Sequence, residues 1–387
     1  MSLNTVSYLA GGEQMIKLLV NHSDLLKGLN SVATALPSRS SLPYLTNVLL
    51  ETEGDTLRLS ATDLDTTVIT TIPASVTTPG SITLPGKKLH EIVRELPDED
   101  VRFSGTGNRI NISCGKGSFS LSGSSSEQFP SIPSKSGADP ATVPIDVLSD
   151  AIRKTSYAVA KDDYRATLNG ALMKMGKEGF EMVATDGHRL SCIALGSLKS
   201  DVEINALVTQ KALNLFAKLS GEGDALVRYK GSQISFEFKD TIIFSRTIDG
   251  EYPPYRKVIP SDNDCLLSTD RHDLISVLRR VKTMANPSTH QIKFSLDGEK
   301  VLIHSESADA GEANEELESE YSGNPFQIGF NGNFLMEILR NMSCDRIVMS
   351  MKDSNTAVII KDEEEPEGSD SYLALIMPVK LSRNVEE

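Results

Sequence analysis

One short segment recurs along the chain and constrains its fold more than any other feature. The clearest copy is Ala184–Leu190, with the sequence Ala-Thr-Asp-Gly-His-Arg-Leu. A weaker copy, Ala-Thr-Asp-Leu-Asp, occupies residues 61–65, and a more degraded one, Ser-Ala-Asp-Ala-Gly, occupies residues 307–311. Each lies 123 residues from the central copy. Because equal spacing is the signature of an internal repeat, the sequence predicts three successive copies of one structural unit.

The hydrophobic pattern supports this threefold repeat. Apolar residues at helical spacing predict an amphipathic helix at the start of each copy, at 24–34 with Ser23 as N-cap, at 147–161 and at 271–284. Short strands follow, then a second helix near 86–96, 210–219 and 333–341, then further strands, the last of the second copy near Val258. The strands alternate apolar and polar residues, as half-buried antiparallel strands do. The expected fold class is α+β, with two helices packed on antiparallel sheets in each domain.

Clusters of Pro, Ser and Gly mark the boundaries between the copies. They lie at 128–143 and 258–264, and the pairs Phe129-Pro130 and Tyr252-Pro253 recur at the 123-residue offset. We therefore expect domains at 15–134, 143–260 and 262–381. Residues 1–14 and 382–387 are expected to be terminal extensions.

The composition indicates a soluble protein of the cytoplasm. Hydrophobic residues make up 39% of the chain, and no apolar run approaches the roughly 18 residues that would span a bilayer. We expect no signal peptide and no membrane partner. The four cysteines, 114, 192, 265 and 344, stand singly. This spacing excludes a Cys-x-x-Cys site and indicates reduced thiols.

The charge is unevenly distributed. The formal net charge of −14 argues against nucleic acid as a partner, yet the six predicted helices together carry +8 and the remainder −22. A cationic helical surface can follow phosphates without reading bases. The alternative is that Lys and Arg occur here only because they are good helix formers. The charge distribution alone leaves both interpretations open.

Catalytic motifs are weak in this sequence. Asp186 and His188 could form an acid–base pair, but Asp-Gly is also a common tight-turn pair. The sequence contains no P-loop, Gly-x-Ser-x-Gly, Rossmann or His-Glu-x-x-His motif, so we expect no catalytic residue, metal or cofactor. The apolar run Tyr372–Leu381 is typical of an edge strand that closes a sheet, although Met377 in it also suits an adaptable binding surface.

Four segments together resemble one known family. They are Leu168-Asn169-Gly170, Ala184–Leu190, Asp249-Gly250 through Tyr255-Arg256, and Met377-Pro378 through Leu381. The chain resembles the bacterial sliding clamps, the beta subunit of DNA polymerase III, from about Met15 to Leu381. The resemblance implies three DNA-clamp domains per chain and a head-to-tail homodimeric ring. Its helices would line the hole around double-stranded DNA, which the ring encircles without sequence specificity.

The resemblance also implies the function and its residues. The clamp would act as a non-catalytic processivity factor, tethering the replicative polymerase, the clamp loader and repair proteins through a peptide pocket. That pocket would comprise Leu168, Thr185, Gly187, His188, Arg189, Leu190, Pro253, Val258, Ser354, Ile376, Met377, Pro378 and Val379. DNA-facing residues would be Arg39, Arg153, Lys154, Lys161, Lys211, Lys218, Arg279, Arg280 and Lys282. Dimer contacts would be Phe119 and Leu121 on one edge and Met284 on the other.

Two alternatives come from other functional classes. The first is a hydrolase that uses Asp186 and His188. The second is a repeat scaffold that binds only proteins. Turnover that depends on His188 would favour the first, and failure to load onto circular DNA would favour the second.

Overall fold

The computed structural model describes residues 15–37, 39–134, 137–161, 164–298, 300–309, 311–364 and 370–381. Both predicted terminal extensions lie outside these residues. The chain divides into two compact units, one of Met1–Ala138 with Lys218–Arg246, the other of Asp139–Ala217 with Thr247–Glu387. Among the helices of the described residues, none is long and apolar enough to cross a bilayer.

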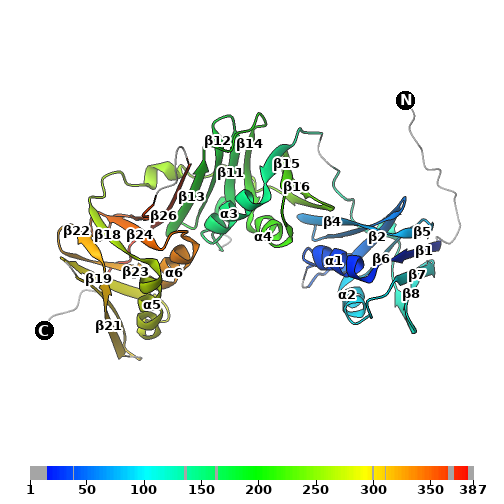
Figure 1. Ribbon diagram of the computed structural model, residues 1–387, viewed down its shortest axis with the longest axis horizontal. Coiled ribbons are helices and arrows are strands. Elements are labelled where there is room, and N and C mark those ends of the chain that lie inside the picture. Colours follow the sequence, from blue (N-terminus) through cyan, green and yellow to red (C-terminus); the bar gives the residue numbers. More distant parts are fainter. Residues whose placement is uncertain are drawn as a thin grey trace. The chain divides into compact units, whose positions relative to one another are not determined.

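Over the described residues, the first unit holds two antiparallel sheets and two α-helices (Figure 1). One sheet has the strand order β5-β1-β7-β8-β9, and the other contains the run β15-β16-β17-β4-β3-β2-β6. The elements are β1 (Met15–Val20), α1 (His22–Ala33), η1 (Pro43–Thr46), β2 (Asn47–Glu53), β3 (Thr56–Thr62), β4 (Thr66–Pro73), β5 (Ser75–Thr78), β6 (Ser81–Pro85), α2 (Gly86–Arg94), β7 (Val101–Thr106), β8 (Arg109–Cys114), β9 (Gly117–Ser122), η2 (Ser126–Gln128), β15 (Asp224–Lys230), β16 (Gln233–Phe238) and β17 (Thr241–Arg246).

The pairing of β4 with β17 explains why this unit combines distant parts of the chain. The two strands are antiparallel, with Thr70 opposite Thr241. Their buried hydroxyl oxygens lie 3.0 Å apart. The sheet is therefore continuous from the end of the second repeat into the first.

Helices α1 and α2 contact each other and cover the strands. Helix α1 buries Leu25, Leu29 and Val32. Its N-cap is Asn21, whose Oδ1 accepts hydrogen bonds from the main-chain N–H groups of Ser23 and Asp24. Ser23 was therefore the wrong prediction for the cap, because the helix begins two residues earlier than its apolar stripe indicated.

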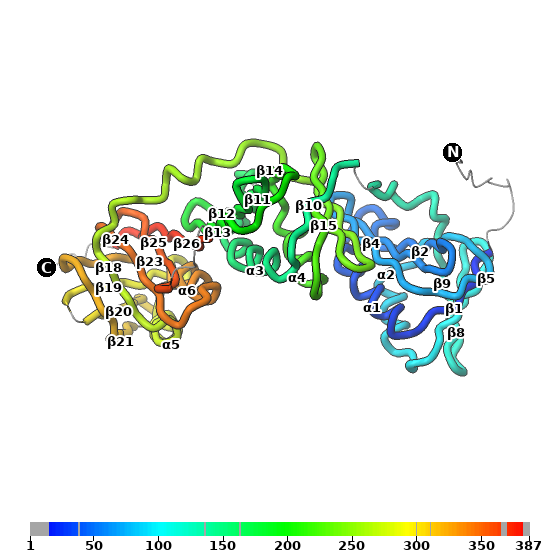
Figure 2. The backbone as a smooth tube through the Cα atoms, turned by 45° about the horizontal axis from the view of Figure 1, so that its top comes forward, coloured from blue at the N-terminus to red at the C-terminus, as the bar shows by residue number. Residues whose placement is uncertain are grey.

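In the part of the chain that the structure describes, the second unit also holds two antiparallel sheets. Figure 2 traces the backbone that runs through them. Their strand orders are β14-β11-β12-β13-β26-β25-β24-β18-β22 and β21-β20-β19-β23. The elements are β10 (Ala141–Pro144), α3 (Ile145–Ser156), η3 (Ala166–Leu168), β11 (Gly170–Gly176), β12 (Gly179–Thr185), β13 (Arg189–Leu195), β14 (Ile204–Thr209), α4 (Gln210–Leu219), η4 (Tyr255–Val258), β18 (Cys265–Asp270), α5 (Arg271–Val281), η5 (Lys282–Met284), β19 (Gln291–Asp297), β20 (Lys300–Ser307), β21 (Gly311–Glu318), β22 (Glu320–Ser322), β23 (Phe326–Asn331), α6 (Gly332–Asn341), β24 (Arg346–Met351), β25 (Val358–Asp362) and β26 (Asp370–Ile376).

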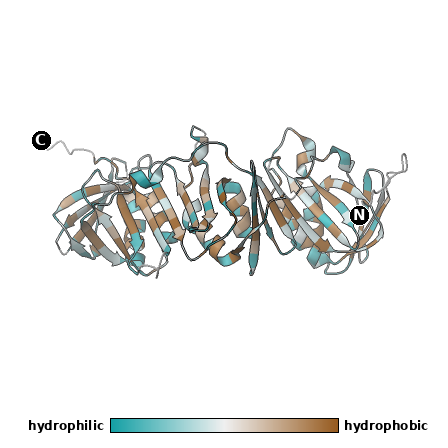
Figure 3. Cartoon of the chain, turned by 90° about the horizontal axis from the view of Figure 1, so that it is seen from above, coloured by the Kyte–Doolittle hydropathy of each residue, from teal (hydrophilic) through white to brown (hydrophobic). Residues whose placement is uncertain are grey.

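The recurring segment occupies the same position in every repeat. It connects β3 to β4, β12 to β13 and β20 to β21. The threefold repeat and the α+β class are thus confirmed. Hydrophobic residues concentrate along the strands of both units (Figure 3).

Four further sequence-based expectations were wrong in detail. A short strand, β1, β10 or β18, precedes the first helix of each repeat. Helix α3 ends at Ser156, so Lys161 lies after the helix and not within it. The helix also contains Asp146, so its two carboxylates balance its two cations and its net charge is zero. Val258 belongs to a 3₁₀ turn and not to a strand, since Pro253 and Pro254 before it lack the N–H that a ladder needs.

The fourth correction concerns the apolar run near the C-terminus. Its strand, β26, is not at an edge but lies between β13 and β25. Its residues Tyr372, Ala374, Leu375 and Ile376 are buried, as suits a central strand.

Candidate protein-binding site at the junction of the second and third repeats

The β13–β26 pairing brings together the two segments that the sequence marked out. Leu190 lies opposite Leu375, and Arg189 opposite Ile376. Beyond the strand end, the Met377 N–H donates a hydrogen bond of 2.8 Å to the His188 carbonyl. The central recurring turn and the Met377-Pro378 segment are therefore neighbours in space.

A shared apolar core underlies this junction. It combines residues of the second repeat, including Leu168, Leu190 and Tyr255, with Ala357 and Leu375 of the third. Two large apolar side chains of the predicted pocket remain accessible, Val258 at 56% and Met377 at 39% exposure. The junction therefore exposes apolar side chains directly above a packed apolar core.

The predicted pocket residues differ in accessibility. Leu168, Arg189, Leu190 and Ile376 are buried; Thr185, Pro378 and Val379 are half-buried; Gly187, His188, Pro253, Val258, Ser354 and Met377 are exposed. The buried members support the surface, and the exposed ones are available for contact.

Polar contacts fix the two walls that carry Val258 and Ser354. The Asn263 amide donates to the carbonyls of Ser350 (2.8 Å) and Ala357 (3.0 Å), which ties the linker after Val258 to the β24–β25 hairpin. Within the hairpin turn, Asp353 accepts hydrogen bonds from the N–H groups of Asn355 and Thr356, and these lower the pKa of its carboxyl.

A second set of contacts holds the 3₁₀ turn η4 against β12. The Tyr255 phenol donates to the Glu181 carboxylate, and Arg256 donates to the same oxygen at 2.9 Å. Burial raises the pKa of the Tyr255 phenol, while the hydrogen bonds to Tyr255 and Glu181 raise the pKa of Arg256. Burial also raises the pKa of the nearby Cys192 thiol to about 12, with a further contribution from the Glu181 charge.

The central turn is built by its own side chains. Gly187 has φ of +87°, a left-handed conformation that favours glycine. The Thr185 hydroxyl donates to the Arg189 carbonyl (2.6 Å) and accepts from the Gly187 N–H (3.1 Å). A Cβ at Gly187 would come within 2.8 Å of the Arg165 guanidinium. The turn therefore requires this glycine.

Asp186 has a structural role in this turn. Its Oδ1 accepts from the N–H groups of His188 (2.9 Å) and Arg189 (3.0 Å), and its Oδ2 accepts from Arg189 Nε (3.1 Å). The His188 ring instead stacks on Phe334, with ring centroids 6.2 Å apart. The carboxylate thus serves the turn and Arg189, which leaves the hydrolase alternative without a catalytic pair.

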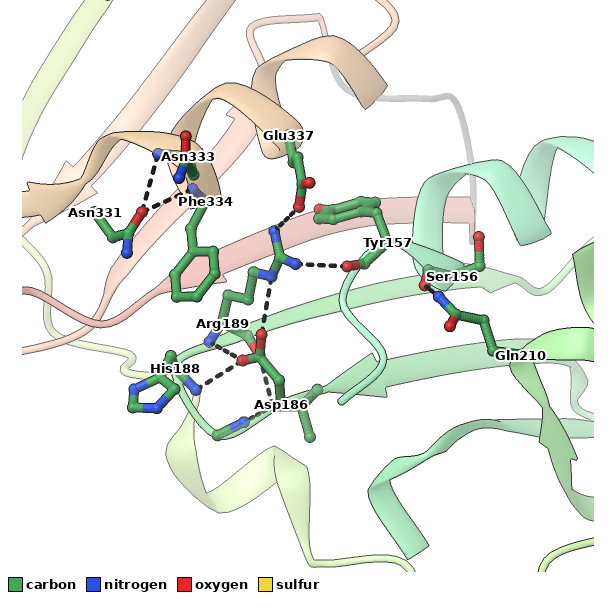
Figure 4. A network of polar contacts seen from close by, with 12 residues as sticks. Ser156, Tyr157, Asp186, His188, Arg189, Gln210, Asn331, Asn333, Phe334 and Glu337 are labelled. Atoms are coloured by element: carbon green, nitrogen blue, oxygen red, sulfur yellow. Dashed lines mark hydrogen bonds and ion pairs between the residues drawn. The ribbon is translucent and has the colours of Figure 1, made fainter. Parts of the chain in front are cut away.

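Arg189 is the centre of a network that the sequence did not reveal (Figure 4). Its guanidinium donates to Asp186, to Glu337 of α6 and to the Tyr157 carbonyl after α3. Phe334 and Glu337 come from the third repeat, about 150 residues away, and nothing in their local pattern distinguishes them from other helix residues. A cleft of about 550 Å³ lies beside this network. In addition to residues of the network, Lys161, Lys282 and Arg340 line it.

The predicted DNA-facing residues fall into two groups. Three are engaged in ion pairs: Arg153 and Lys154 with Asp150, and Arg280 with Glu315. Lys154 is also largely buried, with its ammonium 5.0 Å from the centre of the Tyr372 ring. The second group contains the other six residues. Of these, Arg39, Lys161, Lys218 and Arg279 are exposed, whereas Lys211 and Lys282 are half-buried.

The predicted dimer residues lie at sheet edges. Phe119, at 40% exposure, and the half-buried Leu121 belong to β9, the last strand of its sheet over the described residues. Met284 is half-buried in η5, which contacts the edge strand β21 of the four-stranded sheet.

Comparison with known proteins decides the family. Three family models match successive parts of the chain: the N-terminal (16–133), central (142–254) and C-terminal (256–380) domains of the DNA polymerase III beta subunit. The chain belongs to this family. As a member of the sliding-clamp family it is a non-catalytic subunit, and the hydrolase alternative is unsupported.

Individual relatives match over nearly the full length. The beta sliding clamp of Caulobacter vibrioides is 31% identical over 376 residues, which cover 95% of this chain and 100% of the relative. Among solved structures, the sliding clamp of Bartonella birtlesii, bound to griselimycin, has a TM-score of 0.90 and 28% identity. The C. crescentus clamp, with polyethylene glycol at its putative beta-motif tethering region, has a TM-score of 0.89 and 31% identity. In each structural match, 95% of this chain and 100% of the other are covered.

Proposed function

We propose that this protein is a cytoplasmic DNA polymerase processivity factor. Two copies form a ring around double-stranded DNA, slide without sequence specificity and hold the replicative polymerase on its template. The observation that carries this proposal is the β13–β26 junction, where the two family-typical segments meet over a shared apolar floor. The predicted domains, 15–134, 143–260 and 262–381, are the units of this ring.

The ring closes head to tail in the proposed dimer. Strand β9 contains Phe119 and Leu121 but no charged residue, and Arg109 and Lys116 lie close to it in the chain. Strand β21 carries Glu312, Glu315, Glu316 and Glu318. An edge strand presents unpaired backbone groups to another chain. Pairing of β9 of one copy with β21 of its partner satisfies those groups and joins opposite charges.

Exposed cations hold the DNA in the proposed ring. Arg39, Lys161, Lys218 and Arg279 contact phosphates, assisted by Lys211 and Lys282. Arg153, Lys154 and Arg280 are tied to acids and contribute less. Because contacts to phosphates alone carry no sequence information, they allow sliding.

The partners bind at the β13–β26 junction. Short linear motifs from the polymerase, the clamp loader and repair proteins insert apolar anchors between Val258 and Met377, beside His188 and Ser354. An accessible apolar cleft with few polar groups suits such anchors. We propose griselimycin as a ligand of the same site, since it binds the related clamp of Bartonella birtlesii.

Loading onto circular DNA tests the proposal. The purified protein should sediment as a dimer, be retained on nicked circular DNA after loading, and slide off once the circle is cut. A monomer, or equal retention on cut and circular DNA, would contradict a topological clamp. Retention of proteins but never of DNA would support the scaffold alternative.

A further inference from the structure

We propose that Arg189 is a positioning residue of the protein-binding site. It fixes the Asp186–His188 turn of the second repeat to α6 of the third and does not itself touch the bound peptide. This inference rests on the proposed function, because it concerns how the same site is held ready for partners.

The Arg189 side chain is buried and hydrogen-bonded to three segments of the chain. Its side chain is 3% exposed. Nε donates to Asp186 Oδ2 at 3.1 Å, Nη2 to the Tyr157 carbonyl at 2.6 Å, and Nη1 to Glu337 Oε2. These acceptors lie on three segments: the turn, the end of α3, and α6. A guanidinium buried in this way joins the segments and has little surface left for a ligand.

Arg189 also contacts two aromatic rings. The guanidinium carbon lies 4.4 Å from the Phe334 ring centre and 5.3 Å from that of Tyr157. Phe334 also stacks against the exposed ring of His188, with 24° between the planes. Arg189 and His188 therefore share one ring of α6, so the position of the exposed His188 depends on where Arg189 holds that helix.

The two carboxylates that bind Arg189 differ in their burial. Asp186 is largely buried and Glu337 is 41% exposed, and Arg189 bonds to both. Loss of Arg189 would leave the Asp186 carboxylate buried without its cation, which is strongly destabilising. Loss of Glu337 keeps the Arg189–Asp186 pair and cuts only the connection to α6. Glu337 is therefore the better position for a test.

The experiment compares Glu337→Ala, Glu337→Gln and Arg340→Ala. Arg340 is the matched control, because it lies one turn further along α6 and lines the same cleft without bonding to Arg189. Calorimetry gives the affinity for griselimycin and for a C-terminal peptide of a replicative polymerase. The ¹H and ¹³C resonances of the His188 ring report its stacking on Phe334, and thermal unfolding reports stability.

The expected result separates the variants. Glu337→Ala should weaken both ligands about tenfold, the scale of one lost hydrogen bond to a charged group, and should shift the His188 resonances. Glu337→Gln should restore most of the affinity, since its amide oxygen accepts the same bond. Arg340→Ala should match the wild type.

Two results would overturn the inference. One is a Glu337→Ala variant with wild-type affinity and unshifted His188 resonances. The other is an equal loss of affinity in Arg340→Ala. If the wild type itself bound neither ligand, the proposed binding site would be wrong, and the His188 resonances would still decide whether Arg189 positions the turn.

Discussion

At the scale of single residues, the Ala184–Leu190 segment acts mainly by building a turn. Asp186 and Thr185 bind its main chain, and Gly187 supplies the left-handed conformation. His188 is exposed as a consequence, and Arg189 is buried. Neighbours in sequence thus acquire opposite roles, one at the surface of the site and one beneath it.

Met377 tests the placement of the peptide site. Met377→Asp should lower peptide affinity by about tenfold to a hundredfold, because a bound apolar anchor would bury an unpaired carboxylate. Titration calorimetry measures the loss, and Lys380→Ala, at an exposed position three residues on, serves as the control. Unchanged affinity in Met377→Asp would show that the site lies elsewhere.

Cys192 tests the packing below the site. Since its pKa is raised to about 12, only about one thiol in ten thousand is ionised at pH 8. Its side chain is also buried. Iodoacetamide at pH 8 should therefore modify Cys192 only when the protein unfolds, as mass spectrometry of the digested chain can show. The half-buried Cys344 is the internal reference; labelling of Cys192 at the same rate would contradict the packing.

At the scale of elements, helix positions follow from local sequence, and strand neighbours do not. The observed α4 and α6 coincide with their predicted ranges to within one residue, since an apolar stripe and its flanking residues define a helix locally. Strand β26 was expected at an edge because its pairing with β13, nearly 180 residues away, leaves no local signal.

The cap of α1 gives a prediction at this scale. Asn21→Ala should lower the free energy of unfolding by about 1 kcal/mol, because two N–H groups of the first turn lose their acceptor. Chemical denaturation measures the change. Ser23→Ala, which removes the cap that the sequence suggested, should cost less than half as much. A larger loss for Ser23→Ala would reverse the assignment.

At the scale of the whole molecule, sheets that cross repeat boundaries decide which parts behave as one body. The β4–β17 pair joins the first repeat to half of the second, and the β13–β26 pair joins the other half to the third. The compact units therefore differ from the sequence repeats. The proposed ring extends the same principle across the dimer, by pairing β9 with β21.

Phe119 tests ring closure. Phe119→Asp should convert the proposed dimer into a monomer, because it places a carboxylate opposite the acidic strand β21 of the partner. Sedimentation velocity measures the change, and retention on circular DNA should be lost with it. Phe119→Leu should remain dimeric. A dimeric Phe119→Asp variant would exclude this edge as the interface.

The sequence by itself determined the threefold repeat, the approximate positions of the helices, the turn at Ala184–Leu190 and the family. Each of these depends on residues close together in the chain or on a recurrence that can be counted along it. Only the tertiary structure decided that β26 is a central strand, that Lys154 is withdrawn beside Tyr372, and that Arg189 meets Phe334 and Glu337. Those contacts join residues more than 140 positions apart, and their energy comes from burial and pairing that exist only after the repeats have packed.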